Sequence, residues 1–440
     1  MNRLNYFLHS VIALIVISLF LGDSLGVAFA ETIAFKPSEP KMERFRLGAP
    51  HFLEKIAKGE QTRIAYFGGS ITAADGWRPM TFKRLKEAHP QVDFREINAA
   101  IGGVGSDLGV FRLRHDVLQY DPDLVFVEFT VNDNGMSYDR ILKQIEGIVR
   151  QIWENDATTD IIFVYTFCVG RENDYRANKT PVAVSASEMV ADFYGIPSID
   201  LNVPVVELEK KGKLTFQADT EEEGKILFST DGVHPLTKGH EVYADVVMNF
   251  LEKMRLLDSQ SPYPRSEARV EKLNNSLVDD NYENAKMVPI NPAQLVGKWS
   301  PLPPDSHLSW IKERVGDSVY TSDTPGAKLT IRFKGSYLAV YDVLGPNGGQ
   351  VWVTVDGERR TKPVPRFDSF CTYWRLATLA IASDLDPAVE HTATIEISEE
   401  EPSRQPVAFR LTDPAKELAD PKYHGRNVWF GSILIIGDTL

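Results

Sequence analysis

Residues 63–72 read RIAYFGGSIT, a short apolar run followed by two glycines and a serine. The apolar run predicts a buried β-strand over residues 64–67, and the glycines permit a tight turn after it. Such a turn would raise the hydroxyl of Ser70 at the carboxyl edge of a parallel sheet, where open α/β sheets bind their ligands. A helix-capping serine in an ordinary glycine-rich turn is the alternative interpretation. A phosphate-binding loop is excluded, because neither a Walker lysine nor the GxGxxG spacing follows.

The sequence from residue 63 to residue 255 alternates strand-like and helix-like segments. Strands are predicted over residues 64–67, 92–97, 124–129, 161–167 and 198–201. One amphipathic helix is indicated by isoleucines at helical spacing, namely Ile141, Ile145, Ile148 and Ile152. A second predicted helix, near residues 183–194, ends at Gly195, because glycine is favoured just after a helix. This alternation predicts a three-layer α/β/α domain, with a parallel sheet covered by helices on both faces.

The pattern changes twice after residue 256. Residues 257–292 contain Pro262, Pro264 and an asparagine-rich stretch, which is typical of a connector. Beyond them, strand-like runs with Gly, Pro and Asp between them occupy residues 328–333, 337–343, 351–355, 392–397 and 428–436. No helix of comparable strength competes, so these runs predict an antiparallel, jelly-roll-like β-sandwich. We therefore expect a catalytic domain over residues 31–256, a connector over 257–292 and a β-sandwich over 293–440.

The first thirty residues have the pattern of a secretory signal peptide. Arg3 precedes an apolar run over residues 11–21, and residues 28–30 read AFA, a typical cleavage signature. The run is too short to span a bilayer comfortably, and Asp23 interrupts it. We expect cleavage after Ala30 and a secreted or periplasmic protein that does not insert into the membrane once cleaved. An uncleaved N-terminal anchor is the alternative.

Composition and charge argue against several classes of protein. The chain has 440 residues, with 48 Lys+Arg against 61 Asp+Glu and a net charge of −13, which removal of the signal peptide leaves unchanged. A nucleic-acid-binding protein needs a basic surface, and anionic lipid repels an acidic one. Cys168 and Cys371 are too few for a disulfide framework or a cysteine-rich zinc site. We expect two buried thiols rather than a disulfide, and no metal-ligand spacing is evident.

A serine nucleophile needs a base, and His234 is the strongest candidate. It lies in the stretch STDGVHP, residues 229–235, ahead of a predicted amphipathic helix. Asp231 comes three residues earlier, where a curled loop would let its carboxylate orient the imidazole and stabilise the imidazolium. A loop that merely starts the next helix is the alternative. His240 falls inside that helix and is interpreted as structural, and His115, on a charged helix, as a solvated surface residue.

Two other strand ends are rich in small residues and amides. Residues 98–107 read NAAIGGVGSD, and residues 129–135 read FTVNDNG. Free N–H groups and an asparagine amide are the donors that an oxyanion hole requires. Either loop alone is common. Both follow successive predicted strands beside the Gly-Gly-Ser turn, however, and this combination favours a functional interpretation.

The order of these four blocks resembles that of the SGNH (GDSL-type) hydrolases, over about 200 residues from 63 to 255. The resemblance implies a flavodoxin-like α/β/α fold and a serine hydrolase. It implies that Ser70 is the nucleophile, His234 the base and Asp231 its orienting acid. It also implies an oxyanion hole formed by the N–H groups of Ser70 and Gly103 and the side chain of Asn132.

Two positions depart from the family pattern. Residues 68–71 read GGSI rather than Gly-Asp-Ser-Leu, and Thr130 stands where a glycine is usual. The first change is a known kind of variation, whereas the second would reshape the acyl pocket. A literal GDSL does occur at residues 22–25, but it lies in the predicted signal peptide with no strand before it. We interpret that match as accidental.

The implied reaction is a two-step acyl transfer through Ser70 that needs no metal or other cofactor. The loops near the predicted site are polar, and Arg78, Asp107 and Asn134 are the candidates for binding substrate. Five of the seven tryptophans lie in the C-terminal half, where they either pack in a core or stack on sugar rings: Trp299, Trp310, Trp352, Trp374 and Trp429. An exported enzyme of this composition resembles the SGNH carbohydrate esterases that remove acetyl groups. We therefore expect an O-acetylesterase acting on an acylated oligo- or polysaccharide.

Two other functions remain open at this point. A periplasmic acyltransferase would use the same serine to pass the acyl group to a sugar hydroxyl. A carbohydrate-binding protein with a decayed esterase domain would not use it, although the presence of all three predicted catalytic residues argues against this. The net charge of −13 favours a neutral acetylated glycan over a strongly anionic polymer.

Overall fold

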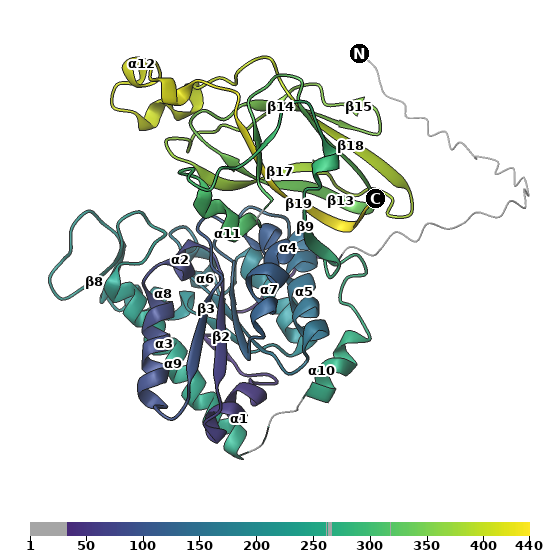
Figure 1. The fold of residues 1–440 in the computed structure, drawn as a ribbon. Helices are drawn as coiled ribbons and strands as arrows, with labels where there is room; N and C mark the ends of the chain where they lie inside the picture. Colours follow the sequence, from purple (N-terminus) through teal and green to yellow (C-terminus); the bar gives the residue numbers. More distant parts are fainter. Residues whose placement is uncertain (1–32, 261, 263–265, 317) are drawn as a thin grey trace, which may run out of the picture. The chain divides into compact units, whose positions relative to one another are not determined.

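The computed structural model describes residues 33–260, 262, 266–316 and 318–440 (Figure 1). The predicted signal peptide over residues 1–30 lies outside the described residues. Residues 34–440 form one compact unit, so the catalytic half and the C-terminal half of the chain share contacts. Within the described ranges, no helix has both the length and the apolar character needed to cross a membrane.

A six-stranded sheet forms the centre of the N-terminal half. Its strands, in spatial order, are β1 (Glu43–Arg44), β6 (Ser198–Asp200), β5 (Asp160–Tyr165), β4 (Leu124–Glu128), β2 (Thr62–Gly68) and β3 (Phe94–Asn98). Only the edge strand β1 is antiparallel. Every residue of β4 and β5 is buried, as expected for a parallel sheet covered on both faces. The order of the parallel strands is the flavodoxin-like one, which confirms the predicted fold.

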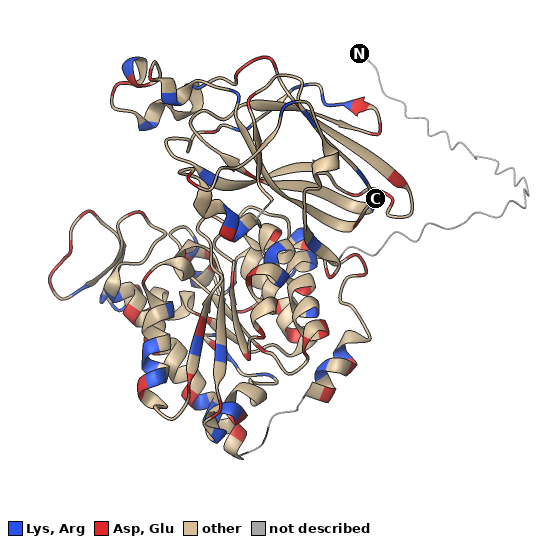
Figure 2. Ribbon diagram, viewed as in Figure 1, with Lys and Arg blue, Asp and Glu red and all other residues tan. Residues whose placement is uncertain are grey.

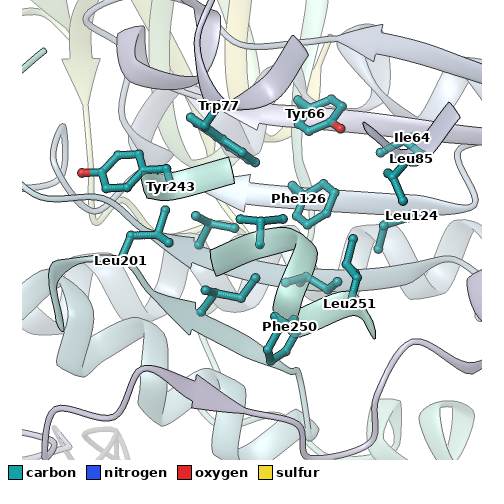
Figure 3. Packing of buried hydrophobic residues seen from close by; sticks show 14 of the residues in the cluster. Ile64, Tyr66, Trp77, Leu85, Leu124, Phe126, Leu201, Tyr243, Phe250 and Leu251 are labelled. Carbon is teal, nitrogen blue, oxygen red and sulfur yellow. The ribbon is translucent and has the colours of Figure 1, made fainter. Parts of the chain in front are cut away.

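Helices cover both faces of this sheet (Figure 1). One face carries α1 (Pro50–Lys58), α3 (Trp77–Ala88), α8 (Asn202–Lys210) and α9 (Thr237–Gln260). The other carries α4 (Ser106–Asp116), α5 (Tyr138–Asn155) and α7 (Val182–Tyr194). On the first face, Tyr66 and Phe126 of the sheet pack with Trp77 and Phe250 of the helices (Figure 3). Acidic and basic residues are interspersed along the helices (Figure 2), as in surface helices that bury one face.

Both helices predicted from periodicity are confirmed. Helix α5 contains the four isoleucines, all buried, and extends beyond them to Tyr138 and Asn155. Its start is capped by Ser137, whose hydroxyl accepts the N–H of Arg140 at 3.4 Å. Helix α7 ends at Gly195, which adopts a left-handed conformation with φ of +77°.

The C-terminal half is an antiparallel β-rich region consistent with the predicted β-sandwich. Its strands are β9 (Ala285–Pro289), β10 (Leu295–Val296), β11 (Ser300–Pro301), β12 (Tyr320–Ser322), β13 (Lys328–Leu344), β14 (Gln350–Val355), β15 (Glu358–Arg359), β16 (Val364–Pro365), β17 (Arg375–Ala382), β18 (Glu390–Ile397) and β19 (Val428–Thr439). Shorter elements are η2 (Pro292–Gln294), η3 (Ser309–Ile311), α11 (Lys312–Val315), η4 (Gln405–Arg410), α12 (Pro414–Glu417) and η5 (Pro421–Tyr423). Residues from β13, β14, β17, β18 and β19 share one core.

Strand β13 joins two segments that the sequence predicts as separate strands. Residues 328–334 pair with β18, residues 338–344 pair with β17, and the pairing with β19 shifts between Gly335 and Tyr337. A Cβ atom on Gly335 would lie 2.2 Å from the carbonyl oxygen of Ile436. The glycine therefore permits a close approach of β13 and β19 and a bulge, so the two predicted strands are one.

Residues 257–292 contain more regular structure than we expected for a connector. Helix α9 extends to Gln260, α10 spans Ser266–Leu273, and β9 pairs with β19 in the C-terminal sheet. The remaining elements of the chain are α2 (Ser70–Ala73), η1 (Leu118–Tyr120), α6 (Glu172–Arg176) and the parallel pair β7 (Leu214–Gln217) and β8 (Ile226–Ser229). Cys168 and Cys371 are both buried and free, which confirms the predicted thiols.

Candidate active site

The turn after β2 places Ser70 at the carboxyl edge of the parallel sheet. Strand β2 ends at Gly68, Gly69 is extended with φ of −90°, and Ser70 begins the short helix α2. A Cβ on Gly68 would lie 2.5 Å from the carbonyl oxygen of Glu128, and one on Gly69 would lie 1.9 Å from Oδ1 of Asn132. No side chain fits at either position, so the two glycines are what allow the turn to lie this close to its neighbours.

Ser70, His234 and Asp231 form a continuous hydrogen-bonded series. The imidazole Nε2 of His234 lies 2.8 Å from Oγ of Ser70, and its Nδ1 lies 2.7 Å from Oδ2 of Asp231. The loop curls as the sequence suggested: Oδ1 of Asp231 accepts the N–H groups of Val233 and His234, each at 2.8 Å. The hydroxyl of Ser229 donates to the same oxygen at 2.9 Å. Four donors, counting the imidazole, thus surround one carboxylate.

These hydrogen bonds determine the charge state of Asp231. Partial burial on its own would raise the pKa of this carboxyl, but the bonds from His234, Val233 and Ser229 lower the pKa well below its ordinary value. The group is therefore a carboxylate at neutral pH. A carboxylate at 2.7 Å from Nδ1 keeps a proton on that nitrogen and leaves Nε2 free to accept one from Ser70.

Three groups near Ser70 are suited to hold a negatively charged oxygen. Gly103 adopts a left-handed conformation with φ of +74°, and nothing lies within 4 Å of where its Cβ would be. In the described part of the chain, neither its N–H nor that of Ser70 donates to any acceptor. The amide of Asn132 lies against Gly69 and likewise has no hydrogen-bond partner among the described residues. The predicted oxyanion donors therefore lie around one turn, and their catalytic role stays a prediction.

A buried glutamate that the sequence did not reveal supports this turn. Glu128, the last residue of β4, is 1% exposed and accepts the hydroxyls of Thr72 at 2.8 Å and Thr166 at 2.7 Å. Burial raises the pKa of Glu128 to about 7, although the threonine hydroxyls offset part of that effect. The only sequence signal was an acidic residue closing the otherwise apolar run LVFVE. Thr72 lies two residues after Ser70, so this contact ties α2 to the centre of the sheet.

Thr130, the departure from the family pattern, is also buried. Its carbonyl oxygen and its hydroxyl accept hydrogen bonds from the guanidinium of Arg171. Arg171 also donates to the carbonyl oxygen of Thr166 at 3.1 Å. The threonine therefore joins the ends of two strands, a contact that a glycine side chain could not make.

Asp133 follows Asn132 and supports the start of α4. Its Oδ1 accepts the N–H of Ser106 at 2.8 Å, and the side chain is fully buried. Burial raises the pKa of Asp133 to about 8, although the bond from Ser106 acts in the opposite direction. Oδ1 of this side chain lies at a helix N-terminus, where it accepts an otherwise unpaired backbone N–H.

The three predicted substrate-binding residues lie in different environments. Arg78 is 5% exposed, donates from Nε to the carbonyl oxygen of Thr72 at 3.0 Å and pairs with Glu96. These contacts argue against Arg78 as a substrate ligand, because internal acceptors already occupy its guanidinium. Asp107 is half-buried in the first turn of α4, and Asn134 is exposed in the loop after β4. For these two residues, binding of substrate stays a prediction.

The other histidines have structural surroundings. His240 is buried, and its Nδ1 accepts the N–H of Trp77 at 3.2 Å at the start of α3, which confirms the structural interpretation. Burial, together with the nearby charge of His234, lowers the pKa of His240 to about 4. His115 lies at the surface on α4, as predicted, but it is only partly solvated: its side chain is 34% exposed, and its Nδ1 lies 2.7 Å from Oδ1 of Asp116. Among the described residues, no group of three or more His, Cys, Asp or Glu could hold a metal ion.

Comparison with known proteins gives two results. Residues 66–242 match the model of the GDSL-like Lipase/Acylhydrolase family. Two solved structures of a two-domain esterase active on acetylated mannans share the fold, one of them co-crystallised with mannopentaose. Each is 19% identical and covers 87% of this chain; the complex with mannopentaose has a TM-score of 0.65 over 92% of its own chain, and the other 0.66 over 93%. No curated protein sequence matches the chain.

Proposed function

We propose that the protein, in which residues 66–242 match the model of the GDSL-like Lipase/Acylhydrolase family, is an exported serine esterase that removes O-acetyl groups from carbohydrates. The observation that carries the proposal is the series Ser70–His234–Asp231, with 2.8 Å and 2.7 Å between successive polar atoms. The series ends at a serine beside N–H groups that have no acceptor elsewhere in the described chain. A nucleophile, a base and oxyanion donors are the parts that acyl transfer requires.

The first half-reaction forms an acyl-enzyme. Oγ of Ser70 attacks the ester carbonyl carbon while Nε2 of His234 takes the serine proton. The carbonyl oxygen becomes an oxyanion, held by the N–H groups of Ser70 and Gly103 and the amide of Asn132. Asp231 stabilises the imidazolium. When the tetrahedral intermediate collapses, the C–O bond to the sugar breaks, and His234 gives its proton to the departing hydroxyl.

The second half-reaction releases the acid. Water enters beside His234, which takes one of its protons as the oxygen attacks the acyl carbon. The same donors hold the second oxyanion. Collapse breaks the bond to Oγ of Ser70, His234 returns the proton to that oxygen, and acetate leaves. The side chains of His234 and Asp231 are 49% and 54% exposed, so water and a polymeric substrate both have access to them.

Acetylated mannan is the first substrate that we propose to test. The two solved structures that share the fold belong to an esterase active on acetylated mannans, and the similarity extends over both halves of this chain. The net charge of −13 also suits a neutral polymer better than an anionic one. In the C-terminal half, Trp429 is buried, whereas Trp310 is 43% exposed and available to stack on a sugar ring.

Export is part of the proposal and is supported by the sequence alone. Residues 1–30 have the charge, the apolar run and the small-residue ending of a cleavable signal. Mass spectrometry of protein recovered from the periplasm or medium of the expressing cell should give an N-terminus at residue 31. Retention in the cell with an intact N-terminus would contradict export.

The central experiment measures acetate release in plain buffer from acetylated mannan, xylan, xyloglucan and pectin. Wild-type protein should release acetate, and Ser70→Ala should release none while keeping the same thermal unfolding curve. Product that appears only when an acceptor sugar is added would favour an acyltransferase instead. A Ser70→Ala variant with the wild-type rate would remove the basis of the proposal.

A further inference from the structure

Helix α4 lies between the catalytic sheet and the C-terminal strands. On the sheet side, Gly109 lies so close to Phe129 that a Cβ atom would come within 2.8 Å of its ring. On the other side, the ring of Phe111 stacks on Tyr337 of β13, with 5.2 Å between centroids and 27° between planes. Residues 108–113 are buried throughout. The helix therefore depends on both halves of the chain for its packing.

Arg112, in the middle of this helix, contacts the strand ends that form the proposed site. It is 0% exposed, and its Nη1 donates to the carbonyl oxygen of Ala99 at 2.6 Å and to Oδ2 of Asp116 at 2.5 Å. Its guanidinium lies 4.5 Å from the ring centroid of Phe67. Phe67 comes three residues before Ser70, and Ala99 begins the loop that carries Gly103. One buried cation thus contacts the segments that supply both proposed N–H donors.

The C-terminal half surrounds this ion pair on its outer side. Tyr341 of β13 is fully buried, and this burial raises the pKa of its hydroxyl, while the charge of Arg112 lowers that pKa and the charge of Asp116 raises it. Glu313 and Arg314 of α11 line a cavity of about 270 Å³ next to this ion pair. The opposite lining includes Asn98, His115 and Asp116. Arg112 and Tyr341 are both fully buried, whereas the cavity leaves the end of β3 at Asn98 exposed.

We infer that the C-terminal β-rich half is a structural part of the proposed esterase site: β9 and Tyr337 of β13 pack on α4, and α4 holds the Gly103 loop through Arg112. The inference rests on the proposed function, because it assigns a positioning role toward an oxyanion donor of that reaction. It predicts that loosening the contact between β13 and α4 lowers turnover even for p-nitrophenyl acetate, which is too small to need a glycan-binding surface. If the C-terminal half only captured polysaccharide, the same substitution would change the KM for the polymer and leave the turnover of p-nitrophenyl acetate unaltered.

The decisive comparison uses two substitutions in β13. Tyr337→Leu removes the ring that stacks on Phe111, whereas Phe333→Leu removes a buried ring that packs in the C-terminal core and against His391. At a temperature where both variants are folded, Tyr337→Leu should lower kcat for p-nitrophenyl acetate roughly tenfold with little change in KM. Hydrogen exchange of residues 99–105 should quicken in the same variant. Phe333→Leu should lower Tm yet keep the wild-type kcat and exchange. Equal effects of the two substitutions on kcat would overturn the inference.

A second variant separates this inference from the proposed function. Arg112→Lys keeps the buried charge, but its ammonium ends one bond short of the position of Nη1, the atom that makes both hydrogen bonds. A fluorophosphonate probe should label Ser70 in the wild type, and labelling of Arg112→Lys should be roughly tenfold slower. An inert wild-type serine would refute the proposed function, whereas equal labelling rates would refute the positioning role alone. If Arg112→Lys does not fold, the comparison of Tyr337→Leu with Phe333→Leu decides the question.

Discussion

His234 is half exposed, yet its position is well defined. Its partner Asp231 accepts hydrogen bonds from two backbone N–H groups and from the hydroxyl of Ser229. Backbone donors lose little freedom when they bind, so the loop itself orients the carboxylate without deep burial. The hydrogen bonds within this short loop orient Asp231, a task that a buried environment often performs for such a carboxylate.

Asn132 is the proposed oxyanion donor that substitution can test directly. Asn132→Ala removes the side-chain amide and leaves both backbone donors, so kcat for p-nitrophenyl acetate should fall by roughly 10²–10³ with little change in KM. Steady-state kinetics measures this. Asn155→Ala, an exposed asparagine at the end of α5, is the matched control and should leave kcat unaltered. If Asn132→Ala also leaves kcat unaltered, the amide is not an oxyanion donor.

Asp133 makes stability depend on pH in a known direction. Burial raises its pKa from 3.8 to about 8, so the folded protein keeps a proton that the unfolded chain loses near its ordinary pKa. The contribution of Asp133 to the free energy of unfolding is therefore fully present below pH 3.8, and it is lost as the pH rises from there to about 8. Glu128, with its pKa raised to about 7, contributes in the same direction.

Urea unfolding of wild type and Asp133→Asn at about pH 5 and about pH 8 tests this linkage. Asparagine keeps an acceptor for the N–H of Ser106 but does not ionise. The free energy of unfolding should fall less between the two pH values in the variant than in the wild type. An equal fall in both proteins would show that Asp133 does not hold a proton in the folded state.

At the scale of elements, the end of β4 supports the turn after β2. Glu128 accepts one hydroxyl from α2 and one from the segment after β5, so three segments meet at a single carboxyl group. The close approach of Gly68 and Gly69 to β4 and Asn132 gives the turn no room for side chains of its own. The position of Ser70 therefore depends on neighbouring strands as much as on its own turn.

Glu128→Leu should unpair two buried threonine hydroxyls. We expect a loss of about 2–4 kcal/mol in the free energy of unfolding, because each unsatisfied buried group costs about 1–3 kcal/mol. Displacement of α2 should also lower kcat for p-nitrophenyl acetate roughly tenfold. Glu128→Gln is the control: its amide can still pair with both hydroxyls, so it should retain most of the stability and activity. Similar losses in the two variants would mean that the charge, not the hydrogen bonds, is what matters.

At the scale of the whole molecule, the two halves of the chain share one helix. Helix α4 is buried by the catalytic sheet on one side and by β13 on the other, and Tyr282 next to β9 lies 6.2 Å from Phe111 between ring centroids. Gln151 of α5 donates both to Val110 of α4 and to Tyr282. The C-terminal strands thus complete the packing of the catalytic half.

A chain that ends at Gln260 should consequently not fold as a stable esterase. Removal of the later residues would expose Phe111 and the buried cation of Arg112 to water. We expect a broad, low thermal transition and no turnover of p-nitrophenyl acetate, measured by circular dichroism and by kinetics on the purified fragment. A cooperative fragment with the kcat of the full chain would show that the catalytic half is independent.

Local patterns in the sequence were sufficient to predict the α/β fold, the sheet edge and the residues that meet there. Period-two and period-3.6 hydrophobic spacing reports on burial directly, and parallel strands bring their carboxyl ends to one edge. Ser70, Asp231 and His234 were singled out because each lies just beyond a strand in a loop of recognisable composition, whereas the choice of Gly103 and Asn132 as donors was implied by the resemblance to the SGNH hydrolases. The bulge that makes β13 one strand was not predicted. It depends on the close approach of Gly335 to β19, a strand that lies about one hundred residues later in the sequence.

Only the tertiary structure showed the buried polar groups that hold the site together. The sequence near Glu128, Arg112 and Asp133 does not reveal their distant partners, Thr72, Ala99 and Ser106, which lie 13 to 56 positions away. It also suggested a surface role for Arg78, which the fold buries against Thr72 and Glu96. A charged side chain can be buried only where other groups pair with it or accept its hydrogen bonds. When those groups lie far away in the sequence, no hydrophobic periodicity reveals them. The place of the candidate site was therefore predictable from local sequence, whereas the contacts that join it to the C-terminal half were decided by the fold.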